Sequence, residues 1–453
     1  MLLIYTTVVS KRLNYIIKTL FADRAKLTTN EAEWMAYEGF RINYSDRHFS
    51  STIAFITIEP QSLLFEEDIH QQHFVYSEWE GMVVFFQTKQ GDLPFDIFAA
   101  AFYLIARYEE YLPFNADEYG RFPHEAGMAF QQGFLKIPLV QYWVKKLLEK
   151  LAAFQYNHSL TAFQNSITNT GATSSFKFIP SYDIDVAYCY QEQPLLKNLF
   201  GFFKCLFQAR FNDFIERANV FSGIQADPYD QYAWLDQLHQ ELKLSPIYFF
   251  LLAKKRKGVD KNISPSKKGL QQLIQQHAKK YIVGIHPSWQ SSNDEKILQE
   301  ERNCMEKIIR FSLFNTAEDY ITIAHSRQHY LRMNLPDTYQ RLMGAGIQHD
   351  YTMGYGAING FRASYAAPFK WYDLSNDQAT DIVIHPFCFM DTTAIFQQRM
   401  PVYDAMQELQ FMYNSVKSVG GEMMCIFHNQ YLSNQLEWKE WKNAYEKFLR
   451  NNA

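Results

Sequence analysis

The sequence predicts an α/β protein whose C-terminal part is a distorted parallel (β/α) barrel of about seven strands, preceded by a smaller α+β domain. Strand-like apolar runs alternate with helical patterns from about residue 176 onward. The runs are continuously apolar, as in strands that are covered on both faces. The chain has 453 residues, more than one hydrophobic core usually serves, so two domains are expected.

The predicted N-terminal domain covers residues 1–165 and has no role that its residues assign. Its first 21 residues favour a strand followed by an amphipathic helix over a signal peptide, because no basic region precedes the short apolar stretch. Further strands are expected at 51–58 and 81–88, helices at 94–112 and 138–154, and a long loop at 113–134.

A polar, Gly/Ser/Thr-rich stretch at 164–177 predicts a linker. The barrel domain is expected to cover 176–450. Its seven predicted strands are 176–185, 245–253, 281–289, 320–329, 347–354, 381–389 and 422–429.

Composition excludes several classes of protein. The formal charge of -4 gives no reason to expect a nucleic-acid or membrane-surface partner. No apolar run approaches the ~20 residues of a membrane span. The five cysteines form no close pair, which favours a reducing compartment and a cytoplasmic location. The expected partner is a small-molecule or oligosaccharide substrate, and the oligomeric state stays open.

Ionisable residues stand at the ends of six of the seven predicted strands. Because the carboxyl ends of parallel strands meet on one face, where ligands bind, we expect these side chains to gather there. One strand ends in two aspartates at alternate positions, whose carboxylates would share a face and repel each other unless a cation or a reaction uses them. The residues are Asp183, Asp185, His286, Arg327, His329, Asp350, His385 and His428.

The order of these motifs resembles the NodB-homology polysaccharide deacetylases of carbohydrate esterase family 4. The motifs are Asp-x-Asp at Asp183, Ile-His-x-Ser at His286, an Arg-centred strand end at Arg327 and a late apolar-x-His at His428. The resemblance covers roughly 176–430. The segments "SRQHYLR", "DYTMGYG", "GFRASYAAPF" and "IHPFCFMDTT" are similar to a bacterial subgroup that carries its own N-terminal domain.

The resemblance implies a hydrolase that acts on C–N bonds other than peptide bonds and uses a divalent metal, usually zinc. It makes Asp183 the general base and His428 the general acid. Asp185 and His286 would be metal ligands, and Arg327 would tune the base. The sequence departs from the family at Gln290, where the family has its second histidine, and Gln is a poor zinc ligand.

Two strand-end histidines, His329 and His385, could replace the missing ligand. His329 follows Arg327 by two, so on a regular strand both would face the same rim, and we predict an Asp185–His286–His329 metal site.

Four further residues are expected to contact the substrate. They are Arg362, Tyr355, His385 and Asp350. Asp391, His325 and His349 receive no role.

Three hypotheses about function remain open. The first is a metal-dependent hydrolase that deacetylates an N-acetylated sugar or a related amide. The second is a catalytically silent homologue that binds a glycan or a partner protein, which Gln290 favours. The third takes Asp183–Asp185 as the metal–nucleotide motif of a glycosyltransferase, but such an enzyme does not need His286 and His428.

Overall fold

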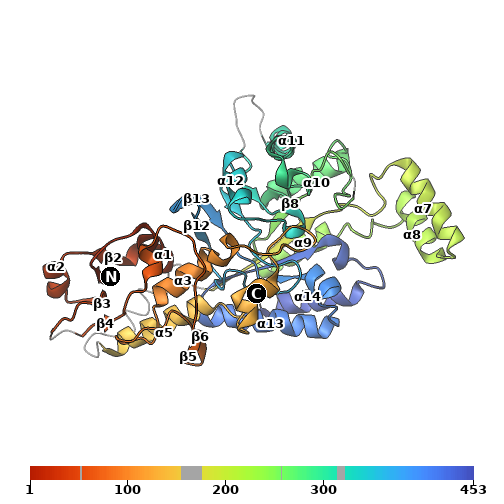
Figure 1. Ribbon diagram of the computed structural model, residues 1–453. Coiled ribbons are helices and arrows are strands. Elements are labelled where there is room, and N and C mark those ends of the chain that lie inside the picture. The colour runs from red at the N-terminus through yellow and green to blue at the C-terminus, as the bar shows by residue number, and fades with distance from the viewer. Residues whose placement is uncertain (52–53, 155–175, 257, 314–321, 453) are drawn as a thin grey trace.

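The computed structural model describes residues 1–51, 54–154, 176–256, 258–313 and 322–452. Its helices and strands form one elongated molecule (Figure 1). The predicted linker, 164–177, lies outside the described residues except for its last two positions.

The N-terminal residues build a small parallel sheet in the order β2-β1-β3-β4. The predicted opening strand and helix are β1 (Leu2–Thr6) and α1 (Lys11–Phe21), and the Ser10 side chain caps α1 by accepting a hydrogen bond from the backbone N–H of Leu13. The other elements of this part are β2 (Ala25–Thr28), α2 (Glu31–Ala36), β3 (Phe40–Tyr44), β4 (Ile56–Thr57), β5 (Ser77–Trp79), β6 (Met82–Val84), α3 (Ile97–Ile105), α4 (Met128–Gln131) and α5 (Leu139–Phe154).

The C-terminal residues form a nine-stranded sheet in the order β12-β13-β11-β10-β9-β8-β7-β15-β14. All pairings are parallel except that of β12 with β13. The strands are β7 (Lys177–Ile184), β8 (Ile247–Phe250), β9 (Ile282–Ile285), β10 (His325–Ser326), β11 (His349–Asp350), β12 (Phe369–Asp373), β13 (Gln378–Ile384), β14 (Phe389–Met390) and β15 (Glu422–His428).

A single chain segment joins the two ends of this sheet. β13 pairs with β11 and β14 pairs with β15, yet only residues 385–388 separate β13 from β14. Within that link, the backbone N–H of His385 donates to the carbonyl of Asp350 at 2.8 Å, and that of Cys388 to the carbonyl of Met424 at 3.2 Å. The sheet therefore curls into a distorted barrel.

The predicted fold class is confirmed, and each of the seven predicted runs contains at least one strand. Two details differ. The run 381–389 supplies two strands, β13 and β14, because it changes neighbours where it crosses from one end of the sheet to the other. The antiparallel edge strand β12 was not predicted.

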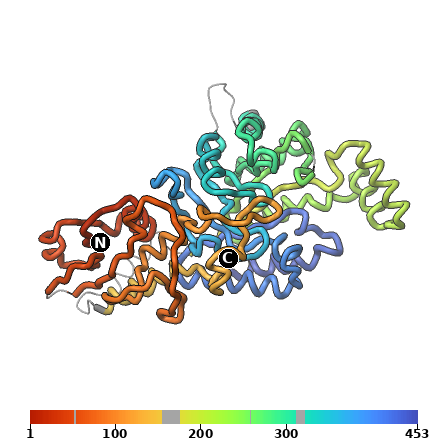
Figure 2. The backbone as a smooth tube through the Cα atoms, viewed as in Figure 1, coloured from red at the N-terminus to blue at the C-terminus, as the bar shows by residue number. Residues whose placement is uncertain are grey.

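Helices follow most of the strands and cover the outside of the barrel (Figure 1). The exception is the pair α7 and α8, which stands out from the body of the molecule in Figures 1 and 2. The helices are α7 (Leu195–Phe207), α8 (Phe211–Phe221), α9 (Tyr232–Leu242), α10 (Lys268–Ala278), α11 (Glu295–Leu313), α12 (Asp337–Gly344), α13 (Val402–Val419) and α14 (Lys439–Asn452).

The N-terminal part packs directly on the barrel. One cluster of buried apolar residues includes Ile16 of α1 and Trp371 of β12. Across the same contact, the Arg12 guanidinium lies 2.9 Å from a carboxylate oxygen of Asp377, and the Tyr15 hydroxyl donates to the carbonyl of Lys370 at 2.7 Å. The division into two domains at 165–176 stays a prediction.

Candidate metal centre and catalytic residues

The ends of three strands, β15, β7 and β9, and the segment after a fourth, β10, bring the predicted residues to one rim of the barrel. Asp183 lies near the end of β7, and His428 ends β15, whose register pairs it directly with Asp183. Asp185 follows β7, and His286 follows β9. Because all of these strands run in parallel, their carboxyl ends place the side chains on the same face.

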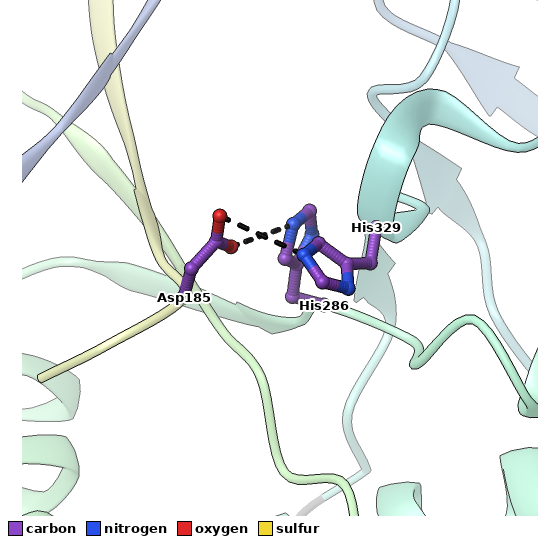
Figure 3. A group of neighbouring side chains, drawn as sticks. All are labelled: Asp185, His286 and His329. Atoms are coloured by element: carbon purple, nitrogen blue, oxygen red, sulfur yellow. Dashed lines mark ion pairs between the residues drawn. The ribbon is translucent and has the colours of Figure 1, made fainter. Parts of the chain in front are cut away.

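Asp185, His286 and His329 form a group that could hold a metal ion (Figure 3). One carboxylate oxygen of Asp185 lies 3.2 Å from His286 Nε2, and the other lies 3.6 Å from His329 Nε2. One ligand atom from each residue lies within 4.8 Å of the other two. One carboxylate and two imidazoles form a common set of protein ligands at catalytic zinc sites.

Neighbouring groups turn the two imidazoles so that their Nε2 atoms face Asp185. His286 Nδ1 lies 2.5 Å from the carbonyl oxygen of Arg327, and His329 Nδ1 lies 2.9 Å from a carboxylate oxygen of Asp260. Ligand histidines are usually held in this way through their second nitrogen. Asp185 Oδ1, the oxygen that lies 3.2 Å from His286 Nε2, is buried and accepts no hydrogen bond. The residues present therefore fit a divalent cation.

His329 reaches the rim by a different route from the predicted one. β10 ends at Ser326, and His329 begins a 3₁₀ turn, His329–Leu331. The alternation argument that placed His329 beside Arg327 on a regular strand is therefore wrong, although the side chain arrives where it was expected.

Gln290 lies beside the metal-ligand group. Its amide nitrogen donates to a carboxylate oxygen of Asp260 at 3.2 Å and to the carbonyl of Lys255 at 2.8 Å. Asp260 in turn contacts His329. The position that carries the second histidine in the resembling family here supports the carboxylate that orients His329.

Asp183 is held by Arg327. The Arg327 guanidinium donates to Asp183 Oδ1 at 2.8 Å, to the Ser181 hydroxyl at 2.9 Å and to the carbonyl of Tyr351 at 3.0 Å, and it lies over the ring of Phe249. These contacts leave Asp183 Oδ2 turned toward the metal-ligand group, 3.8 Å from His286 Nε2.

His428 is held by Asp391, which the sequence analysis left without a role. Asp391 accepts from the backbone N–H of His428 at 2.7 Å and contacts its Nδ1 at 2.7 Å. The His428 Nε2 then faces Asp185, at 3.6 Å from its carboxylate. Burial lowers the pKa of His428, but the charge and hydrogen bond of Asp391 outweigh burial and raise it to about 9. In the sequence, the one sign of a role for Asp391 is its position directly after the end of a strand, β14.

A pocket of about 400 Å³ opens over these side chains. Part of its wall comes from the predicted loop of the N-terminal part, through Tyr119 and Arg121. Arg121 lies over the Tyr119 ring and donates to the carbonyl of Tyr330 at 2.7 Å. Tyr330, Tyr431 and Phe396 add further aromatic wall.

The four predicted substrate contacts are not among the residues that line this pocket. Arg362 is buried in a bidentate ion pair with Glu110, and Tyr355 lies against Arg107. Both side chains line a smaller neighbouring pocket.

Asp350 is fully buried and accepts from Ser326 and Thr352. His385 stacks on Tyr351 and contacts His349. For Asp350, His385, Arg362 and Tyr355, a role in substrate binding stays a prediction.

Comparison with known protein families gives a match in the N-terminal part of the chain. Residues 2–156 match the model of a family of unknown function, DUF7033. No curated protein matches the sequence.

Solved structures of low similarity include a polysaccharide deacetylase from Mycobacterium smegmatis, with 12% identity and a TM-score of 0.38 over 61% of this chain and 83% of that one. The PuuE allantoinase has 10% identity and a TM-score of 0.36 over 61% and 83%. A 4-alpha-glucanotransferase from Thermococcus litoralis has 10% identity and a TM-score of 0.35 over 61% and 37%. All three TM-scores lie below 0.5.

Proposed function

We propose that this protein is a metal-dependent hydrolase that removes an acyl group from the nitrogen of an N-acetylated sugar or a related amide. The observation that carries the proposal is the register of β7 and β15, which sets Asp183 beside His428, so that Asp183 faces His286 and His428 faces Asp185. A base and an acid that both face the metal-ligand group suit the addition of water to an amide and the departure of an amine.

Asp185, His286 and His329 would hold the cation. When bound, a divalent metal ion supplies Lewis-acid polarisation of the amide carbonyl and makes a water molecule more acidic. The zinc identity follows from the ligand types alone and is part of the proposal.

Asp183 is suited to take the proton of the attacking water at Oδ2, because Arg327 already occupies Oδ1. The hydrogen bond from Arg327 also fixes the direction of the carboxylate. On the other side, His428 would deliver a proton from Nε2 to the leaving nitrogen, because Asp391 holds its Nδ1 and so fixes which nitrogen faces the pocket.

The aromatic wall supports a sugar as the substrate. Tyr119, Tyr330 and Tyr431 line the pocket, and flat aromatic faces pack well against the apolar faces of pyranose rings. Arg121 and Lys261 line it as well, and they would favour a substrate with an anionic group.

The test measures acetate release from N-acetylglucosamine oligomers by the full chain loaded with Zn²⁺, Co²⁺ or Mn²⁺. Asp183→Asn and His428→Ala should each lower turnover by roughly 10²–10⁴, the usual size of an acid–base contribution, while metal content stays at the wild-type level. His349→Ala changes a histidine outside the pocket and serves as the control.

Glycan binding without turnover, unaltered by either substitution, would favour the silent homologue instead. Gln290 was the main argument for that alternative. Its hydrogen bond to Asp260 gives a different reason for a glutamine at this position.

A further inference from the structure

The projecting helix α7 turns its apolar side chains toward solvent. Seven large apolar residues are between 48% and 89% exposed, and they are Leu195, Leu196, Leu199, Phe200, Phe203, Leu206 and Phe207. The next helix, α8, adds Phe211, Ile215 and Phe221, which are 47% to 60% exposed. Exposed apolar surface of this extent usually marks an interaction site.

The exposed residues of α7 form one continuous face. At ~100° per residue they fill an arc of roughly 140°, which is the width of an amphipathic stripe. The residues turned inward are Asn198 and Cys205, both buried. α7 therefore presents outward the face that a surface helix normally buries, and its packing on α8 does not use that face.

Basic side chains border the apolar face. On the same helical wheel, Lys197 and Lys204 lie at the edge of the arc. Lys254, Lys255 and Arg256 are exposed in the loop that follows β8, the strand next to β7.

The helices α7 and α8 together form a hairpin. Partial burial lowers the pKa of Lys197 most, Cys189 opposes this shift, and the positive charges of Arg256, Arg217 and Lys261 add to it.

The acidic side chains nearby already have partners. Asp213 pairs with Arg210 within the hairpin, and Glu216 accepts from Tyr190 and Gln435. Glu192 lies 3.9 Å from Lys267. The basic groups at the edge of the apolar face are thus not matched by free acids of the hairpin, and the face is complementary to an anionic surface.

We propose that the α7–α8 hairpin docks on an anionic lipid bilayer, with the apolar arc in the acyl boundary and the lysines at the headgroups. Leucine and phenylalanine on one face with lysine at its edge is the composition of helices that lie in a membrane interface. No polar side chain lies within the arc. Because protein–protein interfaces carry about one hydrogen bond per 100–200 Å², this face suits acyl chains better than a protein partner. No helix of the described residues could cross a bilayer, so the contact would be peripheral.

The hairpin lies on the same rim of the barrel as the candidate metal centre. Both follow β7, since Leu195 comes ten residues after Asp185. Lys261, in the loop that follows β8, lines the pocket. The inference of membrane binding stands whether or not the proposed hydrolysis is correct.

The test is co-sedimentation of the full chain with vesicles of phosphatidylcholine, with and without phosphatidylglycerol. We expect binding to the anionic vesicles. Replacing Phe200, Phe203 and Phe207 together by serine should lower the partition coefficient more than about a hundredfold, because each buried phenylalanine contributes roughly a factor of ten or more. The matched control replaces Tyr403, Phe411 and Leu436 by serine, since these are similarly exposed elsewhere.

Two further measurements separate lipid from other occupants. Lys197→Gln with Lys204→Gln should weaken binding to anionic vesicles by about tenfold and reduce its salt dependence. Tryptophan fluorescence of a Phe203→Trp variant should be quenched by brominated phosphatidylglycerol.

Three outcomes would overturn the proposal: no binding of the wild type to anionic vesicles, equal loss in the control variant, or no quenching at residue 203. A triple serine variant that turns a dimer into a monomer without changing vesicle binding would identify a second copy of the chain as the occupant.

Discussion

Asp260 offers the sharpest test of how the third metal ligand is held. Its carboxylate is buried, lies 2.9 Å from His329 Nδ1 and also accepts from Gln290. It does not belong to the metal-ligand group itself. Partners of this kind typically contribute 10–100-fold to metal affinity, which corresponds to about 1.4–2.7 kcal/mol. Asp260→Asn keeps an acceptor oxygen and should fall near the lower value, and Asp260→Ala near the upper one.

Competition with a chromophoric chelator for Zn²⁺ would measure these affinities, and the visible spectrum of the Co²⁺ form would report any change in ligand geometry. Asp373→Asn is the control, because Asp373 is an equally buried carboxylate that does not line the pocket. If His329→Ala keeps the wild-type affinity, His329 is not a ligand. If the Asp260 variants match the Asp373 control, Asp260 does not orient it.

Three other predictions follow from named contacts. Gln290→His should leave one metal per chain, with affinity changed less than about tenfold, because His329 already completes the group; metal analysis after dialysis checks this. Glu110→Ala should lower the free energy of unfolding by about 3–5 kcal/mol in urea titrations, since it leaves the Arg362 guanidinium buried without its carboxylate. Burial raises the pKa of Asp96 from 3.8 to about 6, so the folded chain binds this proton more tightly than the unfolded one. The free energy of unfolding of the wild type should therefore rise by up to about 3 kcal/mol relative to that of Asp96→Asn as the pH falls from 7 toward 4. If urea titrations give both proteins the same dependence on pH, the prediction is wrong.

The sequence was sufficient for the fold class, and the three residues that it predicts as metal ligands lie together in the structure. Their role as ligands stays a prediction. Continuous apolar runs locate parallel strands, and the rule that their carboxyl ends converge places Asp185 with His286, which are 101 positions apart in the chain. The argument from periodicity placed His329 on a regular strand, but that strand ends three residues earlier, and His329 lies beside Asp185 and His286 because of the turn that follows.

Contacts between distant segments could not be predicted. Nothing local links Asp260 to His329, 69 positions away, or Arg362 to Glu110, 252 positions away. Asp391 follows a strand end but carries no pattern that pairs it with His428. The direction of the apolar face of α7 was equally hidden, since amphipathic spacing gives the face and not what covers it. The net charge of the whole chain, -4, also gives no sign that basic residues border that face.

The hydrogen bond from Arg121 to the carbonyl of Tyr330 links the N-terminal part of the chain to the metal-ligand group of the barrel. Tyr330 has a φ of 59°, a conformation that costs free energy for a residue with a side chain, and it directly follows His329. Gly356 makes room for the Arg121 side chain, because a Cβ at this position would lie 2.3 Å from the Arg121 guanidinium. A residue of the N-terminal part thus steadies the turn that carries a candidate ligand. By reciprocity of linked equilibria, if binding at the rim shifts the turn of His329 and Tyr330, it shifts the loop that carries Arg121 by the same coupling free energy, and a ligand that holds this loop changes the affinity of the rim equally.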